Sequence, residues 1–137
     1  MIDRHEIRVG DVICQLVERS FATVLGIVAI MMAGASYTPL SAAEPLARLL
    51  TIIEPTHARL ILVHSATEHI SLSTLTRVNI NDIVTHESTH TDRVLQLNAV
   101  DVTPDDISHI VFTSGSTGTP KGVSNLSLLV SLHVCLC

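Results

Sequence analysis

Short apolar runs separated by polar turns divide this chain into a regular series of elements. Val12–Val17, Leu60–Val63 and Ile107–Phe112 are almost uniformly apolar. Such runs are typical of the interior strands of a parallel sheet, which are covered on both faces. Shorter extended pieces are predicted at Ser36–Thr38, just before Pro39, and at residues 77–80.

Two helices are predicted among these strands. The apolar segment Phe21–Ala33 follows Ser20, a suitable N-cap residue, and is followed by Gly34, a residue that commonly ends helices. The second helix opens at Pro45, because proline suits the first helical turn. Leucine and isoleucine then recur at helical spacing up to Ile53.

Strands that alternate with helices predict an α/β fold with a partial, mostly parallel sheet and helices on its faces. A weaker helical pattern covers residues 65–76, and the polar residues 81–106 are expected to be irregular. Neither an internal repeat nor a linker divides residues 1–137. In such sheets ligands bind beyond the carboxyl ends of the strands, so the residues immediately after each strand are the candidates for a binding site.

The long apolar run Phe21–Ala35 raises two membrane alternatives. A spanning helix needs about 20 apolar residues, and shorter runs are more often buried helices. A signal peptide with a cleavage site at Ala33–Ala35 is disfavoured, because four acidic residues precede it. We therefore expect a buried helix and no association with a membrane.

Composition narrows the possible partners. The net charge is −5, and no basic stripe with interleaved aromatic residues is present, so nucleic acid is not an expected partner. The three cysteines, Cys14, Cys135 and Cys137, are too few for a disulfide framework. A reducing, cytoplasmic setting is expected.

The segment Thr113–Gly122, T-S-G-S-T-G-T-P-K-G, directly follows an apolar strand and contains Lys121, the only lysine of the chain. Glycine lets a backbone approach a ligand closely, and successive N–H groups can form a nest for an anion. Hydroxyl groups and one ammonium group add donors for phosphate oxygens. A flexible surface loop is the competing interpretation. The common nucleotide loop that ends in Gly-Lys-Ser/Thr is excluded by the ending Pro120-Lys121-Gly122.

Two other patterns carry less weight. His86-Glu87-Ser88-Thr89-His90 matches the zinc-protease pattern H-E-x-x-H, but the surrounding threonines and serine are poor helix formers. A solvated loop is the expected structure there, and no metal site is predicted. The Cys135-x-Cys137 pair is interpreted as incidental, and His109 as a packed or edge residue rather than a catalytic one.

The ten-residue loop resembles the signature of the adenylate-forming (AMP-binding) superfamily, which includes acyl-CoA synthetases, luciferases and nonribosomal peptide synthetase adenylation domains. Segments upstream of the loop resemble other motifs of this superfamily, and they occur in the same order as in the superfamily. They are V-G-D-V-I at Val9–Ile13, L-V-E-R-S at Leu16–Ser20, A-G-A-S-Y-T-P-L at Ala33–Leu40, P-x-x-R-L at Pro45–Leu49 and A-R-L-I-L at Ala58–Leu62. The order is most similar to that of the amino-acid-activating adenylation domains. Three positions depart from the superfamily pattern: Ala35 stands where a second glycine is usual, Ser41 where an aspartate is usual, and Ala47 where an acidic residue is usual.

The resemblance implies ATP-dependent activation of a carboxylic acid, with Mg2+, to an acyl-adenylate and pyrophosphate. The acyl group would then pass to the thiol of CoA or of phosphopantetheine on a carrier domain. The residues implied to bind the β- and γ-phosphates of ATP are Thr113, Ser114, Gly115, Ser116, Thr117, Gly118 and Lys121. We expect the substrate to be a carboxylic acid, and an amino acid is the favoured class.

The resemblance also implies that residues 1–137 are an incomplete N-terminal portion of an adenylation domain. The superfamily's adenine, ribose and acid sites, together with its catalytic lysine, lie further along. The chain is therefore expected to contain no catalytic residue and to be inactive alone. Residues 123–137 depart from the superfamily pattern and are interpreted as an aberrant tail.

Overall fold

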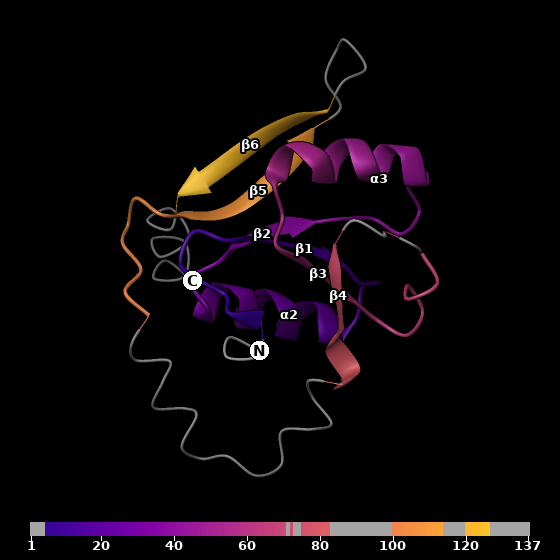
Figure 1. The fold of residues 1–137 in the computed structure, drawn as a ribbon, viewed down its shortest axis with the longest axis horizontal. Helices are drawn as coiled ribbons and strands as arrows, with labels where there is room; N and C mark the ends of the chain where they lie inside the picture. The colour runs from indigo at the N-terminus through magenta and orange to yellow at the C-terminus, as the bar shows by residue number, and fades with distance from the viewer. Residues whose placement is uncertain (1–4, 71, 73–74, 83–99, 114–119, 127–137) are drawn as a thin grey trace.

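The computed structural model describes residues 5–70, 72, 75–82, 100–113 and 120–126. They form a six-stranded sheet with a helix against each of its two faces (Figure 1). In chain order the elements are β1 (Val12–Leu16), α2 (Phe21–Met32), β2 (Ser36–Pro39), α3 (Leu46–Ile53), the 3-10 helix η1 (Glu54–Thr56), β3 (Leu60–Val63), β4 (Thr76–Asn79), β5 (Ile107–Thr113) and β6 (Lys121–Leu126).

The strands lie in the order β4-β3-β1-β2-β5-β6. All neighbouring pairs from β4 to β5 are parallel, and β6 alone runs antiparallel to β5. The chain passes from β1 to β2 on one side and then back to β3 on the other. Because such crossovers are right-handed, α2 and α3 cover opposite faces, as Figure 1 shows. The predicted α/β fold with a mostly parallel sheet is confirmed.

The core is divided between the two faces of the sheet. Alternate residues of the central strands point to opposite sides. The cluster beneath α3 contains Cys14, Leu16, Leu49, Ile52, Ile53, Ile61 and Val63, and the cluster beneath α2 contains Ile13, Ile30, Leu60, Leu62 and Val78. The uniform apolarity of β1 and β3 therefore follows from burial on both sides.

Glycine ends α2 as the sequence indicates. Gly34 has φ of +71°, and its N–H donates to the Met31 carbonyl at 3.0 Å. A Cβ at this position would lie 2.8 Å from Val100 Cγ1. The Gly34 carbonyl in turn accepts the Gly10 N–H at 3.0 Å. The glycines of the first and third upstream motifs thus meet at the amino-terminal edge of the sheet.

The P-x-x-R-L motif forms the start of α3. Pro45 is its N-cap residue. Arg48 pairs with Glu44 at 3.1 Å on the exposed side, whereas Leu49 is completely buried. The motif therefore combines a helix start with one anchor to the core.

Two predictions fail in the later part of the described chain. Residues 65–70 form turns rather than helix, and β4 begins at Thr76. The Thr67 hydroxyl donates to the Leu16 carbonyl at 2.6 Å and accepts the His64 N–H at 3.0 Å, so the segment is tied down by side-chain bonds. The second failure is β6, which the sequence did not predict at all. Its residues 123–126 belong to the segment interpreted as an aberrant tail.

Candidate functional site

The candidate phosphate loop lies in sequence between the two strands of a β-hairpin, β5 and β6, at the carboxyl edge of the sheet. β5 ends at Thr113 and β6 begins at Lys121, and these two residues are direct partners across the hairpin. Partners in an antiparallel pair have Cα atoms about 5 Å apart. The chain therefore leaves β5 at Thr113 and enters β6 at Lys121 at one place, beyond the carboxyl end of a parallel strand.

The hairpin directs Thr113 and Lys121 to the same side of the sheet. Phe112 packs against the core beneath α3, so the neighbouring Thr113 points to the opposite, α2 side. Cross-strand partners share a face, which places the Lys121 side chain on that side as well. Both residues are exposed, and the Thr113 hydroxyl donates to the Lys121 carbonyl at 3.4 Å. The Thr113 hydroxyl and the Lys121 ammonium group therefore lie on the same side of the sheet, where β5 ends and β6 begins.

The other predicted phosphate ligands, Ser114, Gly115, Ser116, Thr117 and Gly118, lie outside the described residues. The structure therefore brings together the first and last members of the predicted set, and the assignment of the intervening residues remains a prediction. The same holds for the H-E-x-x-H segment at 86–90 and for Cys135 and Cys137.

Side chains of β2 and β5 attach the hairpin to the sheet. The ladder between these strands has one Cα pair, Tyr37 with His109. Ser36 supplements it by donating its hydroxyl to the Ile107 carbonyl at 2.6 Å. The buried Ser108 hydroxyl contacts His109 Nδ1 at 2.9 Å and donates to the Asn125 carbonyl at 3.1 Å. His109 therefore lies half-buried within the hairpin's polar network.

A second polar cluster at the carboxyl edge was not found from the sequence. It lies after β3 and β4, where Asn81 donates to the Ser65 hydroxyl at 2.9 Å and Asn79 to the Glu68 carboxylate at 3.2 Å. β3 lies three strands from β5, which corresponds to about 14 Å. These bonds link residues just after β3 to residues at the end of β4, and no spacing in the sequence signals that they meet.

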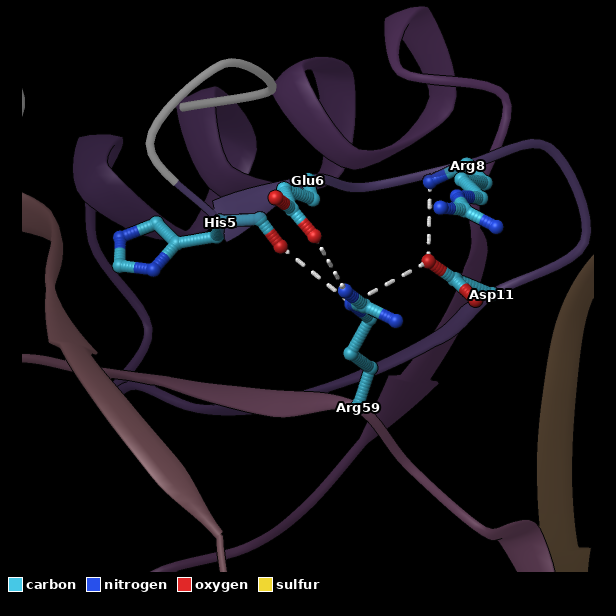
Figure 2. A network of polar contacts seen from close by, with 5 residues as sticks. All are labelled: His5, Glu6, Arg8, Asp11 and Arg59. Carbon is cyan, nitrogen blue, oxygen red and sulfur yellow. Dashed lines mark hydrogen bonds and ion pairs between the residues drawn. The ribbon is translucent and has the colours of Figure 1, made fainter.

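The amino-terminal edge carries an ionic network centred on Arg59, immediately before β3 (Figure 2). Its guanidinium lies 3.7 Å from Glu6 and 3.6 Å from Asp11, and it donates to the His5 carbonyl at 3.3 Å. The Asp11 carboxylate also accepts the Arg8 N–H at 2.9 Å. This network holds the N-terminal segment against β1 and β3, at the edge of the sheet opposite to the loop.

Burial controls the two described groups with shifted pKa values. Burial raises the pKa of the Cys14 thiol to about 12, partly offset by a hydrogen bond with Thr56. Burial also raises the pKa of Tyr37. Both residues lie in the body of the sheet, so neither is a reactive group of the candidate site.

Metal-ligating clusters and membrane-spanning helices are both absent from the described residues. Within these ranges, no three His, Cys, Asp or Glu side chains come together as a metal site would require. Likewise, none of the helices in this part of the chain combines the length and apolarity needed to cross a bilayer. Residues 21–32 of the run considered as a membrane segment form α2, which packs on the sheet through the buried Gly26 and Ile30. The expected buried helix is therefore buried on one side only, and Phe21 is exposed.

The mostly parallel sheet, its two helix layers and the hairpin beyond β5 define the fold as α/β. Two solved structures share this fold. One is the N-terminal subdomain of NpsA from Klebsiella oxytoca, in complex with 3-hydroxyanthranilyl-AMSN. It has a TM-score of 0.73 and 21% identity, over 91% of this chain and 30% of that chain. The other is O-succinylbenzoate CoA synthetase (MenE) from Bacillus subtilis with AMP, with a TM-score of 0.78 and 18% identity, over 98% and 35% respectively.

Sequence comparison identifies the family. The profile of the AMP-binding enzyme family matches residues 1–125, and the chain belongs to this family. Its curated relatives include nonribosomal peptide synthetases. Surfactin synthase subunit 2 from Bacillus subtilis (strain 168) is 34% identical over 119 residues, which cover 87% of this chain and 3% of the relative. The chain thus spans a small part of the relatives that it matches.

Proposed function

We propose that this chain is the N-terminal portion of an adenylating enzyme and supplies its ATP phosphate loop, Thr113–Lys121. The complete enzyme would join a carboxylic acid to AMP, release pyrophosphate and pass the acyl group to a thiol. The direct pairing of Thr113 with Lys121 at the carboxyl edge supports this proposal, because it places the first and last residues of the proposed phosphate loop, a hydroxyl and a cation, side by side. Such preorganised donors stabilise the charge that develops on a leaving pyrophosphate.

The substrate and the acceptor of the reaction are proposed from the similarity to the relatives. Similarity to nonribosomal peptide synthetases favours an amino acid as substrate and phosphopantetheine on a carrier domain as acceptor. An acyl-CoA synthetase is the alternative. Mg2+ would arrive with the nucleotide, because this ion commonly binds through substrate phosphates. Dependence on ATP favours the cytoplasm as the location of the activity.

This chain by itself is proposed to be inactive. Its single lysine is assigned to the phosphates, which leaves no second lysine to act as the catalytic one. A non-catalytic phosphate-binding fragment is therefore the second candidate for the isolated chain. Measurement of ATP–pyrophosphate exchange tests the proposed inactivity of the isolated chain, and exchange catalysed by the purified chain would overturn this part of the proposal.

A chimaera tests the loop itself. In it, this chain replaces the aligned 119-residue segment in an adenylation domain of surfactin synthase subunit 2. We expect amino-acid-dependent exchange, and we expect Lys121→Ala to reduce it by about 100-fold, the cost of losing one preorganised donor. Lys121 is exposed, so the melting temperature should not change. Lys121→Arg, which keeps the charge, serves as the control, and unchanged exchange in Lys121→Ala would refute the assigned role.

A further inference from the structure

Strand β5 contains one more residue than β6 over the stretch where the two strands pair. Ile107 is the partner of Leu126, and His109 is the partner of Asn125, so Ser108 is the extra residue between the two pairs. This arrangement is a β-bulge, in which an extra residue disrupts the ladder locally and changes the direction of a side chain. Bulges are over-represented next to active sites, and this one lies upstream of the candidate phosphate loop in the same strand.

The side chain of Ser108 ties the bulge to β6. Ser108 is 6% exposed, and its hydroxyl donates to the Asn125 carbonyl at 3.1 Å. A hydroxyl has one proton, so the oxygen is left to accept a hydrogen bond, and Nδ1 of His109 lies 2.9 Å away as the donor. A bulge interrupts the regular bonds between two strands. Here a buried serine side chain holds the strands together at the interruption.

The start of β5 is anchored separately, to β2. The buried Ser36 donates its hydroxyl to the Ile107 carbonyl at 2.6 Å. This bond fixes β5 to the sheet immediately before the bulge. Ser36 and Ser108 are therefore similar in burial and in the kind of bond that they make, but only the Ser108 bond joins β5 to β6.

The bulge decides which residue of β6 lies opposite the end of β5. Beyond the bulge the ladder runs without interruption to the pair Thr113 and Lys121. If the register before the bulge continued instead, Lys121 would lie opposite Phe112, and Pro120 would lie opposite Thr113. A slip by one residue moves every side chain of a strand to the other face. The Lys121 ammonium group would then lie on the α3 side of the sheet, away from the Thr113 hydroxyl.

We propose that Ser108 is a positioning residue of the phosphate loop, because it fixes the bulge in β5 and so selects the register that places Lys121 beside Thr113. Ser108 acts through the position of Lys121 rather than by contact with the nucleotide. The role of Lys121 in binding ATP rests on the proposed function, whereas the effect of Ser108 on the register does not.

Disulfide cross-linking measures the register in the full chain. Val111→Cys/Val123→Cys joins two direct cross-strand partners, whose separation allows a disulfide; we call this the native cross-link. Ile110→Cys/Val123→Cys places the two thiols on opposite faces in the observed register and makes them partners only after a slip by one residue; we call this the slipped cross-link. We expect Ser108→Ala to lower the ratio of native to slipped cross-link by about threefold or more.

Two further variants separate the register from stability. Ser36→Ala removes a hydroxyl of similar burial that also donates to a carbonyl of the hairpin, so it should lower the melting temperature comparably and leave the ratio unchanged. Ser108→Thr keeps the hydroxyl and should also keep the ratio. All of these chains carry Cys135→Ser/Cys137→Ser, which leaves the buried Cys14 and the introduced thiols. An unchanged ratio in Ser108→Ala, or an equal change in Ser36→Ala, would overturn the proposal.

ATP–pyrophosphate exchange by the chimaera tests whether the register matters to the site. Ser108→Ala should raise the KM for ATP by about fivefold or more. It should have no further effect in the Lys121→Ala background, because it acts through that lysine. A loss of stability alone would lower exchange by the same factor in both backgrounds, and this result would overturn the positioning role. If Lys121→Ala leaves exchange unchanged, the proposed function fails, and the cross-link ratio still decides whether Ser108 sets the register.

Discussion

The ring of Phe112 occupies the space beside Gly122 on the neighbouring strand. A Cβ on Gly122 would lie 3.2 Å from both Cε1 and Cζ of the ring. Phe112 also packs against the core beneath α3, and the two residues are direct cross-strand partners. The glycine that follows the lysine of the loop motif thus lets an aromatic side chain anchor the hairpin to the core.

This packing predicts that Gly122→Val destabilises the hairpin. The valine methyl groups would push the ring out of its contact with the core, at a cost of about 1–3 kcal/mol in the free energy of unfolding. Urea denaturation measures the loss. Ser124→Val, at an exposed position two residues further along β6, is the control and should cost less than about 0.5 kcal/mol. Equal effects of the two substitutions would contradict the role of the Phe112 ring.

Gly26 of α2 lies over the side-chain amide of Gln15 on β1. A Cβ on Gly26 would be 2.6 Å from Gln15 Oε1, and the amide is held in place by a 3.0 Å bond from Nε2 to the Thr23 carbonyl. Gly→Ala in a helix usually stabilises by about 0.5–1 kcal/mol. Here we expect Gly26→Ala to destabilise by about 1–3 kcal/mol, because it overpacks the interface between helix and sheet.

A double-mutant cycle with Gln15→Ala checks the origin of this effect. Shortening Gln15 removes the clashing amide, so Gly26→Ala should cost much less in the Gln15→Ala background. Thermal unfolding of the four proteins supplies the coupling energy. A stabilised Gly26→Ala single variant would show that the helix moves away from β1 without cost.

The raised pKa of Cys14 predicts a dependence of stability on pH. The folded chain keeps the neutral thiol up to a pKa of about 12, whereas the unfolded thiol ionises near its ordinary value of 9.0. The contribution of this group is therefore fully present below pH 9 and is lost as the pH rises from 9 towards 12. Burial of Tyr37 also lowers the free energy of unfolding at high pH. The contribution of Cys14 is therefore the difference between the wild type and Cys14→Ala in the free energy of unfolding measured from about pH 8 to about pH 12.

Thiol labelling gives an independent readout for Cys14. In a Cys135→Ser/Cys137→Ser background, Cys14 should react with a disulfide reagent at about pH 8 only as fast as the chain unfolds, because the buried thiol is neutral. Rapid labelling under native conditions would show that β1 is accessible. A pH–stability profile identical to that of Cys14→Ala would contradict the pKa shift.

Arg59→Ala should loosen the N-terminal segment more than the fold as a whole. The ion pairs of Arg59 are partly exposed, so we expect a loss of about 0.5–1 kcal/mol in global stability. Hydrogen exchange of the amides at residues 5–11 should accelerate by a larger factor. Arg77→Ala, which removes an exposed arginine from β4, is the control and should leave those amides unchanged.

Much of the fold was predictable because its signals are local. The apolar runs identified β1, β3 and β5, and Ser20 and Gly34 bounded α2 to within one residue. Alternation of strands and helices indicated the mostly parallel sheet. The loop motif together with the upstream motifs identified the AMP-binding family, which the match over residues 1–125 confirms.

The elements that the sequence did not predict depend on contacts between residues that are distant in the chain. Lys121–Leu126 lacks the pattern of a strand and becomes β6 only because β5 offers it a partner, and the turns after His64 depend on a bond from Thr67 to the end of β1. The sequence by itself determined that a Gly/Ser/Thr segment with one lysine follows an apolar run, since residue types and order are local properties, but the expected full burial of that run is wrong, because only Ser108 of β5 is buried. Only the tertiary structure set Lys121 opposite Thr113 and left Phe21 and Val24 of α2 exposed, because pairing and burial depend on which segments meet in space.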